Sequence, residues 1–174
     1  MSSEGFRSQL KMLEVEFENS LEEILLLKDI QRISLPSEVL EDLKAGASLR
    51  IYRWAARKLI EKGLAKPAED FLDLKTVLQL KWKERNEPGE LQPLPAYFYL
   101  RARRELSRGD SELLQHLRDI YSLRLSKIMS FAAKRTPASM IENLTPEEEV
   151  LYENLLGIVN AWYEFIGGGG GSER

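Results

Sequence analysis

The stretch that most constrains the fold of this chain is residues 110–134, DSELLQHLRDIYSLRLSKIMSFAAK, which contains neither proline nor glycine. Its apolar residues recur at the three- and four-residue spacing of one helical face. They are Leu113, Leu117, Tyr121, Ile128 and Phe131, with Leu114, Ile120 and Leu125 widening the face. At about 1.5 Å per residue the helix would be roughly 36 Å long. A helix of this length predicts a domain whose other helices pack around it.

Arg124 interrupts the apolar face of this predicted helix. It lies seven residues after Leu117 and four residues before Ile128. Burying an unpaired guanidinium is very costly, so Arg124 must either extend to water along its apolar stem or meet a carboxylate. In the second case the ion pair would position another helix or another chain. The pattern leaves both interpretations open.

The residues before Pro67 predict a small β-rich domain, residues 1–66. Residues 1–11 show no pattern, and LEVEFEN (13–19) alternates apolar and acidic residues, which predicts a half-buried strand. Apolar runs within 24–35 and 49–52 predict further strands, although so short a run as 24–27 could also be helical. A turn is expected at Ala45-Gly46. Residues 54–62 predict one helix, which Gly63 would end.

The residues after Pro67 predict a helical domain, residues 67–166, with about four helices. The first helix is expected at 70–84, where apolar residues recur at helical spacing (Phe71, Leu74, Val77, Leu78 and Trp82). The proline-containing segment 86–95 would separate it from a second helix at 96–108. The fold class is therefore α+β, a small β-rich domain followed by an all-α helical bundle. The glycine-rich end, 167–174, is either a flexible natural tail or the remnant of a linker.

The last helix has the clearest start signal in the chain. Thr145 is the expected N-cap, Pro146 the first helical residue, and Glu148 completes a capping box. The helix should continue to Ile166 and is apolar on two adjacent sides. One side carries Leu151, Leu155, Ile158, Trp162 and Phe165, and the other Tyr152, Leu156, Val159 and Tyr163. Two apolar sides require two packing neighbours, and the second belongs either to the same domain or to another chain.

Residue types limit the chemistry that this chain can perform. It has no cysteine, so disulfides and cysteine nucleophiles are excluded, and its single histidine, His116, excludes a histidine-rich metal site. The sequence has no glycine-rich phosphate loop between a strand and a helix. Arg101, Arg104 and Arg108 form a basic cluster that is either a solvated helix face or a sequence-independent phosphate contact. The second interpretation would make the chain a free-standing nucleic-acid-binding module.

Two segments of the helical domain resemble a known family. Two segments, LPAYFYLRA (94–102) and RDIYSLRLSKI (118–128), are similar in amino-acid sequence and in spacing to the helical domain of the GINS family of replication factors. The segment LKAGAS leading to IYRWAARKLIEKGLA resembles the small β-rich domain of the same family. The resemblance covers most of residues 12–166. The small domain precedes the helical one, which resembles the arrangement of one of the archaeal subunits.

The resemblance implies a non-enzymatic structural subunit without cofactor or metal, cytoplasmic and nucleoid-associated, with no membrane contact. Its implied partners are a sister GINS subunit, in a 2:2 heterotetramer, together with the MCM helicase and a RecJ-like factor. A weak DNA contact remains an alternative. The apolar faces of the long and last helices supply candidates for the subunit interface, namely Leu117, Tyr121, Arg124, Ile128, Leu155 and Trp162.

Overall fold

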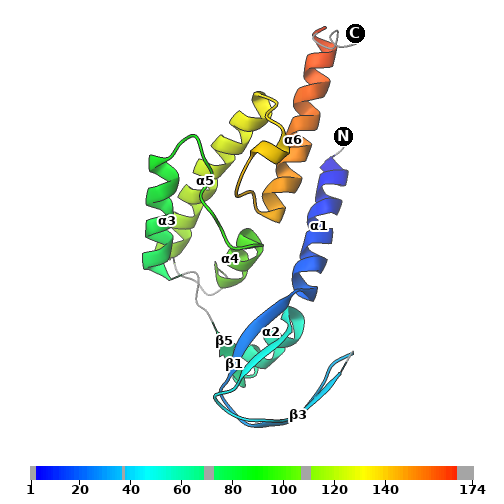
Figure 1. Cartoon of the computed structure of the whole chain (residues 1–174), viewed down its shortest axis with the longest axis vertical. Coiled ribbons are helices and arrows are strands. Elements are labelled where there is room, and N and C mark those ends of the chain that lie inside the picture. Colours follow the sequence, from blue (N-terminus) through cyan, green and yellow to red (C-terminus); the bar gives the residue numbers. More distant parts are fainter. Residues whose placement is uncertain (1–2, 37, 69–72, 107–110, 168–174) are drawn as a thin grey trace. The chain divides into compact units, whose positions relative to one another are not determined.

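The computed structural model describes residues 3–36, 38–68, 73–106 and 111–167, and in it the chain divides into two compact units. One unit comprises residues 14–71 and the other residues 1–13 with 72–174. The first contains the strands and a short helix, and the second is helical (Figure 1). The predicted α+β class, with β-strands before a helical region, is confirmed. The predicted domain limits, 1–66 and 67–166, stay a prediction.

Helix α1 (Ser3–Asn19) replaces the strand predicted at 13–19, so that prediction is wrong, and the same helix includes residues 3–11, where the sequence shows no pattern. Leu13 and Phe17 are buried whereas Val15, midway between them, is 62 % exposed. In a strand all three would share a face, but in a helix Leu13 and Phe17 lie four residues apart on one face with Val15 opposite. Phe6 and Leu10, both half-buried, extend this face toward the N-terminus.

The small unit contains a three-stranded antiparallel sheet in the order β4-β1-β5 and a separate hairpin of β2 and β3. The strands are β1 (Leu21–Leu26), β2 (Ile30–Ser34), β3 (Val39–Leu43), β4 (Ser48–Tyr52) and β5 (Ala65–Pro67). Alternate residues of β1, Ile24 and Leu26, are buried against Ile51 of β4 and helix α2 (Arg53–Glu61). Strands β1, β2 and β4 and helix α2 lie where the sequence predicts them, whereas β3 and β5 do not appear among the predictions.

Turn chemistry in the small unit follows the sequence. Gly46 has φ +85° in the predicted turn, and Gly63 has φ +65° directly after α2. Both angles lie in the left-handed region that only glycine enters at little cost, so Gly46 allows the predicted turn and Gly63 allows the predicted end of the helix.

The helical unit is built from α3 (Leu74–Asn86), α4 (Phe98–Leu106), α5 (Ser111–Ala133) and α6 (Pro146–Phe165), with a 3-10 turn, η1 (Ala138–Met140). The predicted long and last helices are confirmed as α5 and α6. Helix α5 packs against α3 and α6 and lies between them (Figure 1). The predicted capping box of α6 is present, with the Thr145 hydroxyl accepting from the Glu148 N–H and the Glu148 carboxylate accepting from the Thr145 N–H.

Candidate functional site

Arg124 is fully buried at the centre of the helical unit, and its 0 % exposure excludes the alternative of a stem that extends to water. Its guanidinium makes five hydrogen bonds. Nε and Nη2 donate to the two carboxylate oxygens of Glu148 at 2.5 and 2.6 Å, and Nη1 donates to Glu84. The carbonyls of Gln92 and Asn143 accept the remaining two at 2.7 and 2.8 Å. All five donors of the side chain are therefore satisfied.

The carboxylates around Arg124 tie separate elements together. Glu84, also 0 % exposed, comes from α3 and accepts from Arg124, Lys127 and the Gln92 N–H. Glu148 comes from the first turn of α6 and accepts from the Tyr99 hydroxyl of α4 as well as from Arg124. Two buried cations thus face two buried carboxylates. We call Glu84, Arg124, Lys127 and Glu148 the charge network; it joins α3, α5 and α6 with the loop before α4.

The charge network and its burial alter the ionisation of its neighbours. Burial alone would lower the pKa of Arg124, but the hydrogen bonds and charge of Glu148, with the charge of Glu84, raise it overall. Burial and then the charge of Glu148 raise the pKa of Tyr99 well above its usual value. Burial, assisted by Glu147, raises the pKa of Tyr121 to about 12. Arg124 therefore stays charged, and both phenols stay protonated, throughout the neutral range.

The raised phenol pKa values predict a loss of stability in alkali. An unfolded tyrosine ionises near 10.0 while folded Tyr121 ionises near 12, so the unfolded state releases its proton first and the free energy of unfolding falls as pH rises from 10 toward 12. Urea midpoints measured across this range should decline more shallowly in Tyr121→Phe than in wild type. Tyr163→Phe, at an exposed tyrosine, is the matched control and should retain the wild-type decline. Equal declines in all three proteins would contradict the prediction.

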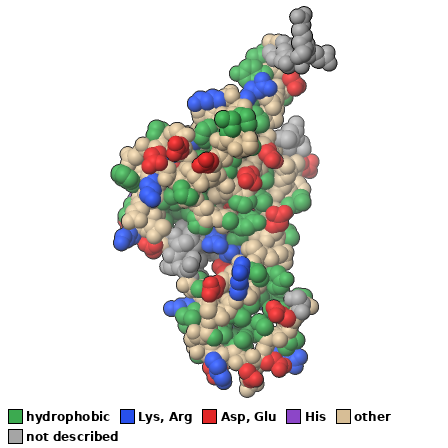
Figure 2. Space-filling model, in the orientation of Figure 1, with side chains coloured by type: hydrophobic (Ala, Val, Ile, Leu, Met, Phe, Trp, Pro, Cys, Tyr) green, Lys and Arg blue, Asp and Glu red, His purple; other side chains and the backbone are tan. Residues whose placement is uncertain are grey.

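The last turns of α6 expose a row of large hydrophobic side chains. Ile158, Trp162 and Phe165 are 60, 58 and 81 % exposed and lie four and three residues apart, on one helix face. Hydrophobic side chains are visible over this end of the molecule in Figure 2. The first half of α6 is packed instead, with Tyr152 buried against Ile128 of α5. We call Ile158, Trp162, Phe165 and Ile166 the α6 apolar surface; in the described part of the chain, nothing covers it.

The six residues predicted for the subunit interface do not form one surface. Leu117, Arg124 and Ile128 are buried inside the helical unit, so they support the fold of α5 and could affect a partner only indirectly. Tyr121 and Leu155 are half-buried, and the centre of the Tyr121 ring lies 4.9 Å from that of Tyr99, with the two rings tilted by 41°. Among the six, Trp162 is the residue that offers a large exposed side chain. The interface role therefore stays a prediction that centres on α6.

The basic cluster predicted for a phosphate contact lies largely outside the described part of the molecule. Arg101 is half-buried in α4 and has interaction partners of its own. The side chain of Arg104 and all of Arg108 lie outside the described residues. His116 is half-buried between α3 and α5, with Nδ1 3.2 Å from Lys81 Nζ. This placement makes His116 part of a helix contact, not of a nucleophile–base pair.

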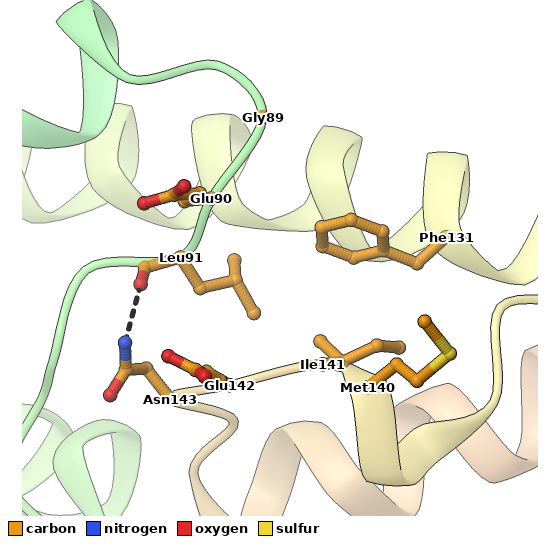
Figure 3. Close-up of a pocket in the computed structure, with 8 residues that line it drawn as sticks. All are labelled: Gly89, Glu90, Leu91, Phe131, Met140, Ile141, Glu142 and Asn143. Carbon is orange, nitrogen blue, oxygen red and sulfur yellow. Dashed lines mark hydrogen bonds between the residues drawn. The ribbon is translucent and has the colours of Figure 1, made fainter.

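A cavity of about 270 Å³ lies where the loops before α4 and after α5 meet (Figure 3). Asn143 Nδ2 donates to the Leu91 carbonyl at 2.9 Å and holds the two loops together. In Figure 3, Leu91, Phe131 and Ile141 converge on the cavity, whereas the carboxylates of Glu90 and Glu142 lie away from the Phe131 ring. The lining also includes the carboxylates of Glu90 and Glu142, but it contains no histidine, lysine, serine or threonine that could form a nucleophile–base pair with them.

The described residues also bear on metal binding and membrane insertion. Over the described ranges, no three histidine, cysteine, aspartate or glutamate side chains come together as a metal site. None of the helices in those ranges combines the length and apolar character needed to cross a bilayer. A helical unit with a buried charge network at its centre and an exposed apolar helix end has the features of an assembly component.

Comparison with known proteins shows the family to which the chain belongs. The family model Sld5, described as the GINS complex protein helical bundle domain, matches residues 71–167, more than half of the chain, and the chain belongs to this family. The match confirms the resemblance noted for the helical domain. No curated protein matches the chain. Membership makes the chain a GINS complex subunit in DNA replication, a non-catalytic structural protein whose partners include other GINS subunits.

Proposed function

We propose that this chain is the archaeal type of GINS subunit that carries the small β-rich domain before the helical domain. The order of the two regions supports this assignment, because the strands of residues 21–67 precede the family match at 71–167. In this proposal the chain pairs with a sister GINS subunit in a 2:2 heterotetramer. The tetramer then joins the MCM helicase and a RecJ-like factor in the replicative unwinding assembly.

The observation that carries the proposal is the α6 apolar surface. Its four side chains are each more than half exposed, and the Trp162 and Phe165 rings lie 5.9 Å apart, so they present a continuous aromatic face. Monomeric proteins rarely leave such a face in water, and it marks a site of protein association. Tryptophan at the centre of an interface commonly dominates its binding energy. We therefore propose Trp162 as the anchor of the sister-subunit contact.

Co-purification with the sister GINS subunit tests this proposal. The wild-type chain, of 20.0 kDa, should form a 2:2 complex by mass measurement, and it should be prone to association when expressed alone. Trp162→Ala should weaken the complex about tenfold or more, because truncating an aromatic anchor commonly costs at least about 2 kcal/mol. The melting temperature of the free variant should stay near wild type, since Trp162 is exposed.

Trp82→Ala, which removes an equally exposed tryptophan from α3, is the matched control and should leave the 2:2 complex intact. A stable wild-type monomer with no affinity for the sister subunit would overturn the proposal. So would a Trp162→Ala variant that assembles as tightly as wild type.

A further inference from the structure

Helix α3 carries its own exposed apolar ridge. Leu74, Leu78 and Trp82 are 39, 42 and 65 % exposed and recur every four residues, over about 12 Å of helix. The same helix buries Val77 and Glu84 on an adjacent side, against α5. The apolar pattern that predicts this helix in the sequence is therefore turned mostly toward solvent. Rows of residues four apart are the ridges by which one helix packs into another.

Apart from Asp73 at the helix N-terminus, the charges beside this ridge are positive. Lys75, Lys83 and Arg85 are exposed, whereas Glu84, the one acidic residue in α3, is buried in the charge network. Among the described residues, neither Lys83 nor Arg85 has an ion-pair partner. Asp73, at the helix N-terminus, is hydrogen-bonded to Thr76. The face is thus apolar along its centre and cationic at its margins.

We propose that this α3 face docks an acidic amphipathic helix of a partner protein. The leucines and tryptophan would pack against the apolar side of that helix, whose carboxylates would meet Lys75, Lys83 and Arg85. One apolar side chain of the partner would bind in a hollow lined by Leu78, Gln79, Trp82 and Lys83. A single-stranded nucleic acid fits this face less well, because aliphatic leucines give no stacking platform for bases.

This docking surface is separate from the one proposed for the sister subunit. Helix α5 lies between α3 and α6, so the α3 face and the α6 apolar surface belong to helices on opposite sides of α5 (Figure 1). A subunit bound on α6 leaves the α3 ridge accessible. Two partners could then be held at once by one helical unit, which is what a component linking several proteins requires.

Fluorescence anisotropy of a labelled synthetic peptide tests the proposal on the full chain. The probe is a fourteen-residue helical peptide with leucine at every third and fourth position and glutamate elsewhere. It should bind with a Kd on the order of tens of micromolar, weakened by added salt. A second peptide of the same composition, with its leucines scattered around the helix, should bind at least about tenfold more weakly, because it offers no continuous apolar side.

Variants locate the binding on α3. Trp82→Ala should weaken the peptide about tenfold, and the double change Lys83→Glu with Arg85→Glu should weaken it by a similar factor, since it reverses the charge at the margin. Trp162→Ala and Lys134→Glu remove an exposed tryptophan and reverse an exposed lysine elsewhere, and both should leave binding within about twofold of wild type. The α3 variants should still assemble with the sister subunit, so failure here is distinguishable from failure of the proposed function.

Three results would overturn the proposal. The first is no binding of the amphipathic peptide at about 1 mM, the weakest affinity that specific recognition would show. The second is equal binding by wild type and Trp82→Ala. The third is binding of a fifteen-nucleotide thymidine oligomer that displaces the peptide and depends on Trp82, which would assign the face to single-stranded nucleic acid instead.

Discussion

Replacing Arg124 with alanine is expected to lower the free energy of unfolding by about 3–5 kcal/mol. The substitution removes five hydrogen bonds and leaves the Glu148 and Glu84 carboxylates buried, with Lys127 as the remaining cation of the network. Since a small domain is stable by only about 5–15 kcal/mol, much of the variant should unfold well below the wild-type melting temperature. Urea and thermal melts measure the loss directly.

Arg124→Lys should also be poorly tolerated, although the charge is kept. The guanidinium donates to both oxygens of Glu148 at 2.5 and 2.6 Å, and a single ammonium cannot reproduce this planar fork. Arg118→Ala, at an exposed arginine of the same helix, is the matched control and should cost under about 0.5 kcal/mol. An Arg124→Ala melting temperature within a degree of wild type would show that the network contributes little to stability.

Long elements with strong periodic signals are the part of the fold that the sequence predicts well. The predicted start of α6 agrees with the structure residue by residue, because a capping box depends on local contacts alone. The prediction fails at α1, where a seven-residue alternation is taken for a strand. The helical spacing of Phe6, Leu10, Leu13 and Phe17 becomes visible only over a longer window. Short strands such as β3 and β5 depend on pairing with distant segments, which no local pattern records.

The candidate site is predictable in part, for a similar reason. Arg124 stands out because a charged residue interrupts an apolar stripe, but its partners lie 40 and 24 residues away in sequence. Glu84 falls seven residues after Val77, on the buried side of α3. In the sequence alone it looks like an ordinary surface glutamate, because the pattern does not show which side of the helix is buried. Glu148 is predicted as a helix cap, and the structure adds that the same carboxylate binds Arg124.

The rotation of α3 about its axis shows why apolar spacing alone does not identify its buried face. Leu74, Leu78 and Trp82 form the more regular stripe in the sequence, yet Val77 and Glu84 face α5. We expect the charge network to fix this orientation, because Glu84 contacts Arg124 and Lys127 only in this rotation of the helix. The apolar ridge is consequently left exposed to solvent. The same rotation of α3 thus places Glu84 in the charge network and leaves the proposed docking surface exposed.

Glu84→Ala should therefore be nearly as damaging as Arg124→Ala, with an expected loss of about 3–5 kcal/mol. The change removes the carboxylate partner of Lys127, which is 7 % exposed, and one of the two carboxylates that face Arg124. It also leaves the Gln92 N–H, now bound at 2.9 Å to Glu84, without its acceptor. Because Glu84 sets the rotation of α3, hydrogen exchange should increase along α3 more than along α6.

A double-mutant cycle separates this network effect from general loss of packing. Arg124→Ala and Glu84→Ala share a contact, so the double variant should lose less stability than the sum of the singles, by about 1–3 kcal/mol. Glu153→Ala, at an exposed glutamate of α6, is the control that should cost under about 0.5 kcal/mol and add to Arg124→Ala without coupling. Strict additivity of the Glu84 and Arg124 changes would mean that the two buried charges act independently, and α3 would then owe its orientation to apolar packing.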